Sequence, residues 1–337
     1  MTAPPLALTM GEPAGIGGEL TLLAWQRRQV ETVPPFFVLD DPARLERLAG
    51  ALGWAVPLRP VAAPEDAAAV FPQALPVLPV ALPRPVTAGH PDPANAPAVI
   101  QAIRTATALA GAGRAAALVT NPIQKETLYA AGFRHPGHTE FLAELAGGAE
   151  VAMMLACPEL RVVLATVHLS LREAVAALST GKIVAAGRIA AAALVRDFAI
   201  ARPRLAVAAL NPHAGEGGTL GREEIEIIAP AVAALRASGI AAEGPAPADT
   251  LFHPAARRRY DAVLCMYHDQ ALIPLKTIDF AGGVNVTLGL PFIRTSPDHG
   301  TALDIAGSGK ADPASLVAAL KLASEMAARR AAQRASA

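Results

Sequence analysis

The chain has 337 residues, of which 53% are hydrophobic and 17% are charged. Its 29 Lys and Arg residues balance its 29 Asp and Glu residues, so no overall charge would attract nucleic acid or an anionic membrane. The length exceeds what one compact core usually holds, which predicts two lobes. Because the overall charge is balanced, any anionic ligand must be bound by a local cluster of basic groups.

The N-terminus and the two cysteines predict a cytoplasmic protein. The first residues carry no basic segment, and the apolar stretch that follows is too short for a signal peptide. No apolar run reaches the roughly 18 residues needed to span a bilayer. Cys157 and Cys265 are far apart in sequence and each adjoins an apolar run. We expect them to be buried, reduced thiols.

The first strand is predicted at residues 6–10 and runs directly into the glycine-rich segment 11–20, GEPAGIGGEL. A strand, a glycine-rich turn and a helix N-terminus together can bind an anion. However, the segment has neither the Walker lysine nor a GxGxxG run. We therefore interpret it as a tight turn in which the glycines supply backbone freedom.

The next segments predict further strands and helices. Residues 36–39 read as a strand, and the following Asp40-Asp41-Pro42 predicts the N-terminus of a helix over 43–52. Residues 57–97 are rich in proline but keep short apolar runs, which indicates edge strands and loops. A helix is predicted over 98–110.

A repeated pattern occupies the middle of the chain, where four continuous apolar runs each end in polar residues. The runs cover 115–119, 161–167, 205–210 and 262–267, and the polar residues that follow are Thr120-Asn121, His168, Asn211-Pro212-His213 and His268-Asp269-Gln270. The segments between them, 123–131, 171–195 and 222–238, have helical patterns. This alternation predicts an α/β fold with a largely parallel sheet. In such sheets ligands bind at the carboxyl ends of the strands.

Three of these strand ends carry a histidine: His168, His213 and His268. Their wide spacing excludes a local zinc motif, and a single histidine would more simply be structural. Three histidines at equivalent strand ends predict a divalent-metal site with an open coordination position. Whether the three meet within one subunit or across a dimer interface is left open by the pattern.

Other polar residues predict binding of an anionic substrate. His138 and Thr139 lie in the segment FRHPGHTE, where Thr139 could cap a helix and also contact a ligand. Lys276, Asn285 and Arg294 follow His268. Arginine offers a bidentate fork to phosphate or carboxylate and lysine a point charge, so a phosphorylated or carboxylated substrate is expected.

Five motifs, in order along nearly the whole chain, resemble those of the 4-hydroxythreonine-4-phosphate dehydrogenases. These are NAD-dependent enzymes of pyridoxal 5'-phosphate biosynthesis. The motifs are GEPAGIG (11–17), VTNPIQKE (119–126), PGHTE (136–140), LNPHAGE (210–216) and YHDQ (267–270). The first motif departs slightly from the family pattern GDPAGIGPE, with Glu12 and Gly18 in place of aspartate and proline. More distantly, GEPAGIGGEL and HGTALDIAG (299–307) are similar to segments of isocitrate and isopropylmalate dehydrogenases.

The resemblance implies an isocitrate/isopropylmalate dehydrogenase-like fold, with two α/β lobes around a cleft. It implies an outer, dinucleotide-side lobe made of residues 1–135 and 285–337, and a central metal and dimerisation lobe made of residues 136–284. It also implies a homodimer whose active site lies at the subunit interface.

The same resemblance implies roles for individual residues. A divalent metal (Zn, Mg or Co) would be bound by His168, His213 and His268. The phosphorylated substrate would be bound by His138, Thr139, Lys276, Asn285 and Arg294. NAD or NADP would lie along residues 288–304, with Gly289, His299, Gly300 and Asp304 as contacts.

The expected reaction oxidises 4-phosphooxy-L-threonine to a 3-oxo acid, which loses carbon dioxide to give 3-amino-2-oxopropyl phosphate. The general base remains open among Lys276, Asp249 and Asp269. One alternative is a related dehydrogenase acting on 4-phospho-D-threonate or 4-phospho-D-erythronate. Another is a three-histidine metallohydrolase that needs no nucleotide, although the HGTALDIAG segment argues against it. A noncatalytic binding protein is the least favoured, since it would not need an open metal site.

Overall fold

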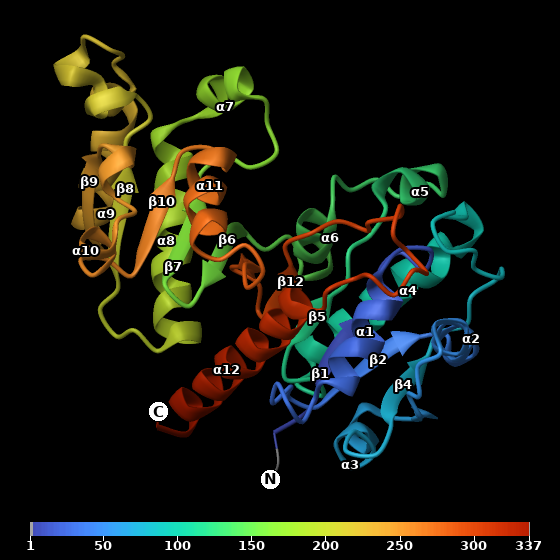
Figure 1. Ribbon diagram of the computed structural model, residues 1–337. Coiled ribbons are helices and arrows are strands. Elements are labelled where there is room, and N and C mark those ends of the chain that lie inside the picture. The colour runs from blue at the N-terminus through green and yellow to red at the C-terminus, as the bar shows by residue number, and fades with distance from the viewer. Residues whose placement is uncertain (1–2, 337) are drawn as a thin grey trace. The chain divides into compact units, whose positions relative to one another are not determined.

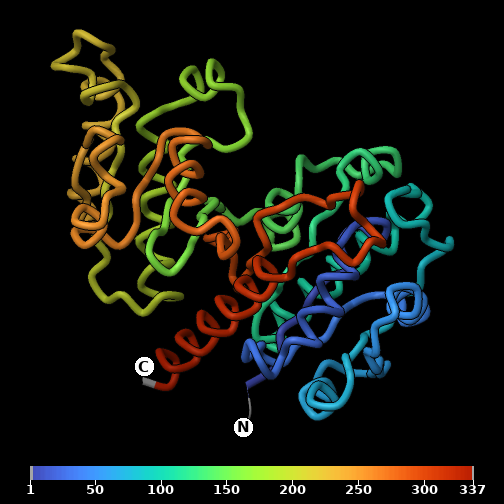
Figure 2. The backbone as a smooth tube through the Cα atoms, viewed as in Figure 1, coloured from blue at the N-terminus to red at the C-terminus, as the bar shows by residue number. Residues whose placement is uncertain are grey.

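The computed structural model describes residues 3–336 and divides the chain into two compact units (Figure 1). Unit 1 comprises Met1–Ala149 and Leu290–Ala328, and unit 2 comprises Glu150–Gly289 and Arg329–Ala337. Each unit has a sheet with helices packed beside it, which confirms the predicted α/β fold. Figure 2 shows that the chain returns to unit 1 after unit 2, so that the C-terminal red segment lies beside the N-terminal blue one.

The strands of unit 1 follow the order β3-β4-β2-β1-β5-β12 and all run parallel. They are β1 (Leu6–Thr9), β2 (Phe36–Asp40), β3 (Leu58–Pro60), β4 (Leu75–Pro79), β5 (Leu118–Thr120) and β12 (Arg294–Pro297). Its helices are α1 (Gly17–Gln26), α2 (Pro42–Leu52), α3 (Ala67–Val70), α4 (Ala96–Gly111), α5 (Lys125–Ala130), α6 (His138–Leu145) and most of α12 (Ala314–Ser336). The proline-rich stretch contains the edge strand β3 and its neighbour β4, as predicted.

The strands of unit 2 follow the order β11-β6-β7-β10-β8-β9. They are β6 (Ala152–Cys157), β7 (Leu160–Leu164), β8 (Arg204–Ala208), β9 (Ala241–Ala246), β10 (Ala262–Cys265) and β11 (Val284–Leu288). Its main helices are α7 (Leu171–Ala177), α8 (Thr180–Phe198), α9 (Ala229–Ala237), α10 (Pro254–Arg257) and α11 (His268–Ile278). β11, β6 and β7 pair antiparallel, and β7, β10, β8 and β9 pair parallel. β7, β10 and β8 are largely buried, as their continuous apolar sequences predict.

Three predicted helix ends can be compared with the structure. Asp41 caps α2 by accepting a hydrogen bond from the Arg44 amide at 3.0 Å, as predicted. The segment 171–195 is helical as predicted, but it forms two helices, because Leu178 is extended and Ser179 caps the second one, α8. Thr139 does not cap α6, since that helix begins at His138 and its N-cap residue is Gly137.

Helix α12 contributes to both units. In unit 1 the Thr295 hydroxyl donates to the carbonyl of Ala319 at 2.9 Å. In unit 2 Arg330 forms an ion pair with the buried carboxylate of Asp197 on α8. The end of the helix is therefore bonded to α8 of unit 2, and its earlier part to β12 of unit 1.

Cys157 and Cys265 are both free and buried, as predicted. Within residues 3–336, no single helix is long and apolar enough to cross a membrane. Only α7 and α8 taken together meet that test, and they are bent by 91° at their junction.

Candidate active site

The three histidines follow three neighbouring strands of unit 2. β10 pairs in parallel with β7 on one side and with β8 on the other. The carboxyl ends of these strands therefore meet at one edge of the sheet, the edge where α/β proteins bind ligands. His168 follows β7, His213 follows β8, and His268 begins the helix after β10. The topology thus places three potential ligands after adjacent strand ends.

The structure brings His168 and His268 together. Their ring centroids are 5.8 Å apart, and both residues line a pocket of about 290 Å³ together with Asp269. Two imidazoles bound to one zinc ion through bonds of about 2.0–2.1 Å would have centroids within roughly 6.5 Å of each other. The pair therefore fits a shared divalent ion in donor type and spacing.

His213 is exposed, in a turn after β8. Among residues 3–336, no three His, Cys, Asp or Glu side chains come close enough to hold a metal ion. Within one chain, therefore, only two of the three predicted metal ligands, His168 and His268, lie together, and His213 does not join them. The predicted role of His213 as a ligand stays a prediction.

Two buried side chains connect the three strand ends. The Gln270 side chain donates to the Ala209 carbonyl at 2.7 Å and accepts from the Met266 amide at 2.7 Å. The Thr166 hydroxyl donates to the Met266 carbonyl at 2.7 Å. These bonds link the segments that carry His168, His213 and His268. Gln270 belongs to a polar group at a strand end that the sequence singled out, but this connecting role was not predicted.

Asp269 contacts its neighbour His268. Its Oδ1 lies 2.7 Å from His268 Nδ1, so the ring Nδ1–H can donate to the carboxylate. A carboxylate in this position fixes the orientation of the ring and leaves Nε2 free to bind a metal. Asp249, another predicted catalytic residue, is exposed in the short 3₁₀ turn Ala248–Thr250.

Lys276 and Asn285 are also in unit 2. Lys276 lies near the end of α11, with its ammonium 5.2 Å from the centroid of the Phe280 ring. Asn285 lies on β11, and its Oδ1 is buried with no hydrogen-bond partner within the described part of the chain. A buried amide oxygen in this state is suited to accept a hydrogen bond from a bound molecule.

Arg294 and His138 are neighbouring basic groups of unit 1. Arg294 begins β12, is 4% exposed, and donates from Nη2 to the Thr120 hydroxyl at 2.7 Å. Burial lowers the pKa of its guanidinium to about 10, although Glu140 acts in the opposite direction. A buried cation with a lowered pKa is in a setting that an anion would stabilise.

His138 lies at the start of α6, and its Nε2 is buried with no partner in the part of the chain that is described. Burial, together with the charges of Arg294 and Lys125, holds the pKa of His138 well below its ordinary value. The ring is therefore neutral at pH 7 and can donate or accept a hydrogen bond. Thr139 follows on the same helix and is half-buried. Lys125 stands in a motif that the sequence singled out, without a role assigned.

The glycine-rich segment of unit 1 contacts the predicted dinucleotide loop, 288–304, and the residues that directly follow it. The buried carboxylate of Glu19 accepts hydrogen bonds from the amides of Gly307 and Gly309, at 2.5 and 2.9 Å. The Ile16 amide donates to the Thr301 carbonyl at 3.0 Å. A Cβ on Gly15 would lie 2.8 Å from that same carbonyl oxygen. This glycine permits close approach of two backbones, a role that the interpretation as a tight turn did not include.

The predicted dinucleotide contacts are divided between the units. Gly289 is in unit 2, and His299, Gly300 and Asp304 are in unit 1. Nothing within residues 3–336 lies within 4 Å of a Cβ built on Gly300, and Asp304 is exposed. The Nε2 of His299 is buried without a partner in this same described range. These groups fit a dinucleotide, since they offer an open backbone, a free carboxylate and an unused ring nitrogen.

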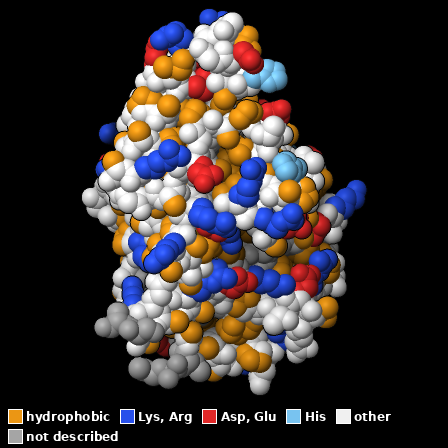
Figure 3. Space-filling model, turned by 90° about the vertical axis from the view of Figure 1, so that its left-hand side faces the viewer, with side chains coloured by type: hydrophobic (Ala, Val, Ile, Leu, Met, Phe, Trp, Pro, Cys, Tyr) orange, Lys and Arg blue, Asp and Glu red, His pale blue; other side chains and the backbone are white. Residues whose placement is uncertain are grey.

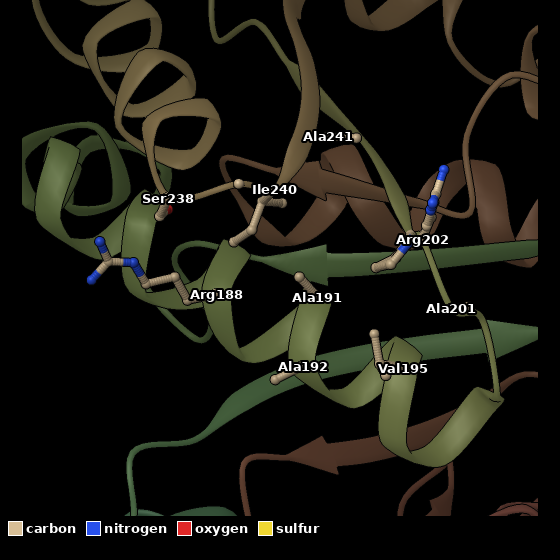
Figure 4. Close-up of a pocket in the computed structure, with 11 residues that line it drawn as sticks. Arg188, Ala191, Ala192, Val195, Ala201, Arg202, Ser238, Ile240 and Ala241 are labelled. Atoms are coloured by element: carbon tan, nitrogen blue, oxygen red, sulfur yellow. The ribbon is translucent and has the colours of Figure 1, made fainter.

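A separate pocket in unit 2 contains none of the predicted site residues. Its volume is about 680 Å³, and small apolar side chains of α8 face the turn before β9 (Figure 4). Arg188 and Arg202 lie beside it and are exposed. We assign no chemistry to this pocket.

The fold and these groups define a class of protein: a two-unit α/β enzyme with imidazole donors at one sheet edge and a buried arginine beside a histidine with a buried Nε2. Comparison with known proteins narrows the class. Residues 31–323 match the family model described as "Pyridoxal phosphate biosynthetic protein PdxA".

A protein of Caulobacter vibrioides named 4-hydroxythreonine-4-phosphate dehydrogenase is 56% identical over 336 residues, covering 98% of this chain and 99% of the relative. The crystal structure of 4-hydroxythreonine-4-phosphate dehydrogenase from Klebsiella pneumoniae superposes with a TM-score of 0.88 at 40% identity, over 96% of this chain and 99% of that one. A terephthalate 1,2-cis-dihydrodiol dehydrogenase from Burkholderia xenovorans also matches, with a TM-score of 0.64 at 31% identity, over 96% of this chain and 98% of that one. The chain belongs to the PdxA family of pyridoxal phosphate biosynthetic proteins.

Proposed function

We propose that the chain oxidises 4-phosphooxy-L-threonine with NAD, in the synthesis of pyridoxal 5'-phosphate. Membership of the PdxA family supports a dehydrogenase of this pathway. The single structural observation that carries the substrate assignment is the buried guanidinium of Arg294 beside a neutral His138. These two side chains offer the charge and the hydrogen-bond donors that a phosphate monoester requires.

The phosphate would be held mainly by unit 1. Arg294 supplies a fixed fork of N–H donors, His138 supplies its Nε2 position, and Thr139 supplies a hydroxyl. We assign Lys276 and Asn285 to binding of the same substrate. Asn285 Oδ1 would accept a hydrogen bond from the amino or hydroxyl group of the substrate. Fixing the phosphate would hold the reacting carbon in place for hydride transfer.

The reaction takes two steps. First, the hydroxyl gives its proton to a base and its carbon gives a hydride to NAD, which yields the 3-oxo acid and NADH. Then the bond to the carboxylate breaks, carbon dioxide leaves, and the carbon takes up a proton to give 3-amino-2-oxopropyl phosphate. A divalent metal held by the histidines would supply Lewis acidity to the reacting oxygen.

The three candidates for the base differ in their surroundings. The carboxylate of Asp269 already contacts His268 Nδ1, which favours an orienting role. Lys276 and Asp249 remain the candidates for proton transfer. We assign NAD in preference to NADP, because the exposed Asp304 carboxylate would accept hydrogen bonds from a ribose and repel a 2'-phosphate.

We further propose that the enzyme is a homodimer with its active site at the subunit interface. The third metal donor, His213, does not join His168 and His268 within one chain. Exposed apolar side chains also follow each of these strand ends: Leu169, Leu171, Leu220, Ile225, Ile273 and Phe280. A partner chain would cover such residues.

A mixing experiment tests this arrangement. His213→Ala and His268→Ala should each be inactive alone. If the site takes one of these histidines from each chain, co-refolded mixtures should recover about a quarter of wild-type activity, because half of the dimers would be mixed and one of their two sites intact. No recovery, together with a monomer in sedimentation analysis, would contradict the dimeric site.

The remaining assignments concern the lobes and the location. We assign dinucleotide binding to the predicted outer lobe and metal binding and dimerisation to the predicted central lobe. Figure 3 shows basic and acidic side chains interspersed on one face of the chain, consistent with its balanced charge. The free, buried thiols are consistent with a cytoplasmic location.

The deciding experiment measures NADH formation by the purified protein with NAD, a divalent metal and 4-phosphooxy-L-threonine. Parallel assays use 4-phospho-D-threonate, 4-phospho-D-erythronate and unphosphorylated 4-hydroxythreonine. The proposal expects the highest kcat/KM on the phosphorylated amino acid and a large loss without the phosphate. A higher kcat/KM on either phospho-sugar acid would assign the related dehydrogenase instead. Phosphate release without NAD would indicate the metallohydrolase.

A further inference from the structure

The segment that carries His213 has an unusual backbone. Six consecutive residues, 213–218, have positive φ angles. Three of them are not glycine: His213 (φ 53°), Ala214 (φ 54°) and Glu216 (φ 45°). L-amino acids disfavour this left-handed conformation, and a run of such residues persists only where the surrounding structure holds it. We call residues 212–218 the left-handed turn.

One buried carboxylate contacts the chain just before this turn. Glu224 is 4% exposed. Its Oε1 accepts hydrogen bonds from the backbone amides of Leu210 at 2.8 Å and Asn211 at 2.7 Å. Its Oε2 accepts from the side-chain amide of Asn211 at 3.0 Å. A single side chain thus binds three donors on the two residues that lead from β8 into the turn.

The turn is also packed closely against Glu224. A Cβ built on Gly215 would lie 2.6 Å from Glu224 Oε2, so the carboxylate occupies the space that a side chain there would need. The neighbouring Glu223 adds a hydrogen bond from Asn211 Nδ2 at 2.7 Å. Gly221 fits here only as glycine, since its Cβ would meet Asn211 Nδ2 at 2.2 Å.

The helical segment that bears Glu224 is itself irregular. Residues Glu224–Ile228 form a π-helical turn, which is rare and occurs frequently at functional sites. This turn is tied to α8 by a hydrogen bond of 2.9 Å from the Thr180 hydroxyl to the Ile227 carbonyl. The π-helical turn that carries the Glu224 carboxylate is therefore held in place by α8.

We propose that Glu224 is a positioning residue that holds the left-handed turn and so sets the place of His213. The inference rests on the proposed function, because the metal-binding role of His213 is part of that proposal. Glu224 touches neither substrate nor metal in this assignment. It acts through Asn211 and the backbone that leads to His213.

The test compares Glu224→Ala and Glu224→Gln with the matched control Glu226→Gln. Glu226 lies on the same turn but is exposed and paired with Arg222. The first measurement is amide hydrogen exchange at Leu210 and Asn211 in protein freed of metal. Exchange should speed up strongly in Glu224→Ala, less in Glu224→Gln, which keeps one carbonyl acceptor, and not at all in the control.

The second measurement is zinc affinity by calorimetric titration. We expect a loss of about 10- to 100-fold in Glu224→Ala, the range found when groups that orient a metal ligand are removed. The loss should be partly restored in Glu224→Gln, with NAD affinity unchanged in both variants. If Glu224→Ala does not fold, Glu224→Gln and the exchange measurement decide.

Two outcomes separate this inference from the proposed function. Unchanged exchange at Leu210 and Asn211 in the folded Glu224 variants would overturn the positioning role, whatever the metal does. Zinc affinity that is equal in wild type and His213→Ala would instead remove the metal role of His213, while accelerated exchange would still identify Glu224 as the residue that holds the turn.

Discussion

The side-chain amide of Gln270 donates to the backbone carbonyl of Ala209 across 2.7 Å. The two residues are neighbours of the proposed ligands, since Gln270 lies two residues after His268 and Ala209 lies four residues before His213. The same side chain accepts from the Met266 amide. One buried glutamine therefore couples the positions of two strand ends, which makes the imidazole geometry depend on a residue that need not touch a ligand.

Replacing Gln270 by alanine should weaken metal binding by about 10- to 100-fold, because the segments that follow β8 and β10 would lose the side chain that links them. It should also lower the free energy of unfolding by about 1–3 kcal/mol, since the Met266 amide and the Ala209 carbonyl would be left unpaired. Zinc titration and urea unfolding measure the two effects. The exposed Gln101 offers a control, and Gln101→Ala should change neither. Equal zinc affinities in all three proteins would contradict this prediction.

Arg294→Lys should raise the KM for the phosphorylated substrate by roughly 10- to 100-fold, the equivalent of losing a charge-assisted hydrogen bond of about 1.5–3 kcal/mol. Lysine keeps the charge but not the guanidinium fork, which contacts Thr120 and in the proposal also binds the phosphate. Inorganic phosphate should raise the Tm of the wild type and not that of the variant. The exposed Arg59→Lys serves as the control and should behave as wild type in both assays. A variant that phosphate still stabilises would place the anion site elsewhere.

His138 should make the protein less stable in mild acid. Its pKa is lowered in the folded state, so the unfolded chain binds the proton more readily once the pH falls below about 6.5. The contribution of neutral His138 to the free energy of unfolding is therefore fully present above that pH. It declines as the pH decreases toward the folded-state pKa. Urea unfolding at about pH 7.5 and pH 5.5 should show a smaller decrease in His138→Gln than in wild type. The exposed His90→Gln should keep the wild-type decrease.

Glu19→Ala should increase the KM for NAD more than the KM for the substrate. The amides of Gly307 and Gly309 would lose their acceptor, which would loosen the segment directly after the predicted dinucleotide loop. The unpaired amides should also cost about 1–3 kcal/mol of stability. Hydrogen exchange over 299–309 would locate the change, and Glu19→Gln should show a smaller one. The exposed Glu46→Gln is the control. An unchanged KM for NAD alongside faster exchange would separate the loop from cofactor binding.

Much of the fold follows from local sequence patterns. The apolar runs that end at Thr120, His168 and His268 predicted buried strands, because strands covered on both faces need continuous apolar residues. Asp41 before Pro42 predicted a helix start. The break between α7 and α8 was missed, because the helical pattern continues on both sides of Leu178 and the backbone change there depends on capping by Ser179.

The sequence predicted which types of residue form the candidate site better than it predicted the contacts that hold them in place. His168 and His268, two of the three histidines singled out by their equivalent places after strands, lie close together in the structure. The contacts of Glu19 with Gly307, of Thr120 with Arg294 and of Gln270 with Ala209 join residues far apart in sequence, and no local pattern indicates such pairs. Glu224 lies in a segment that reads as an ordinary helix, so its hydrogen bonds to Asn211 required the structure.

The bonds from Glu19 to Gly307 and Gly309 have a consequence for how the protein is made. They join residues 288 and 290 positions apart in sequence. β12 likewise pairs with β5, although the whole segment Glu150–Gly289 lies between these two strands in sequence. Unit 2 is formed almost entirely by the continuous segment Glu150–Gly289. During synthesis on the ribosome this segment can fold first, because the N-terminal part of unit 1 cannot complete its strands until β12 has been made. In a nascent chain halted once Gly289 has left the ribosomal exit tunnel, unit 2 should therefore resist proteolysis and the GEPAGIGGEL segment should remain open to cleavage.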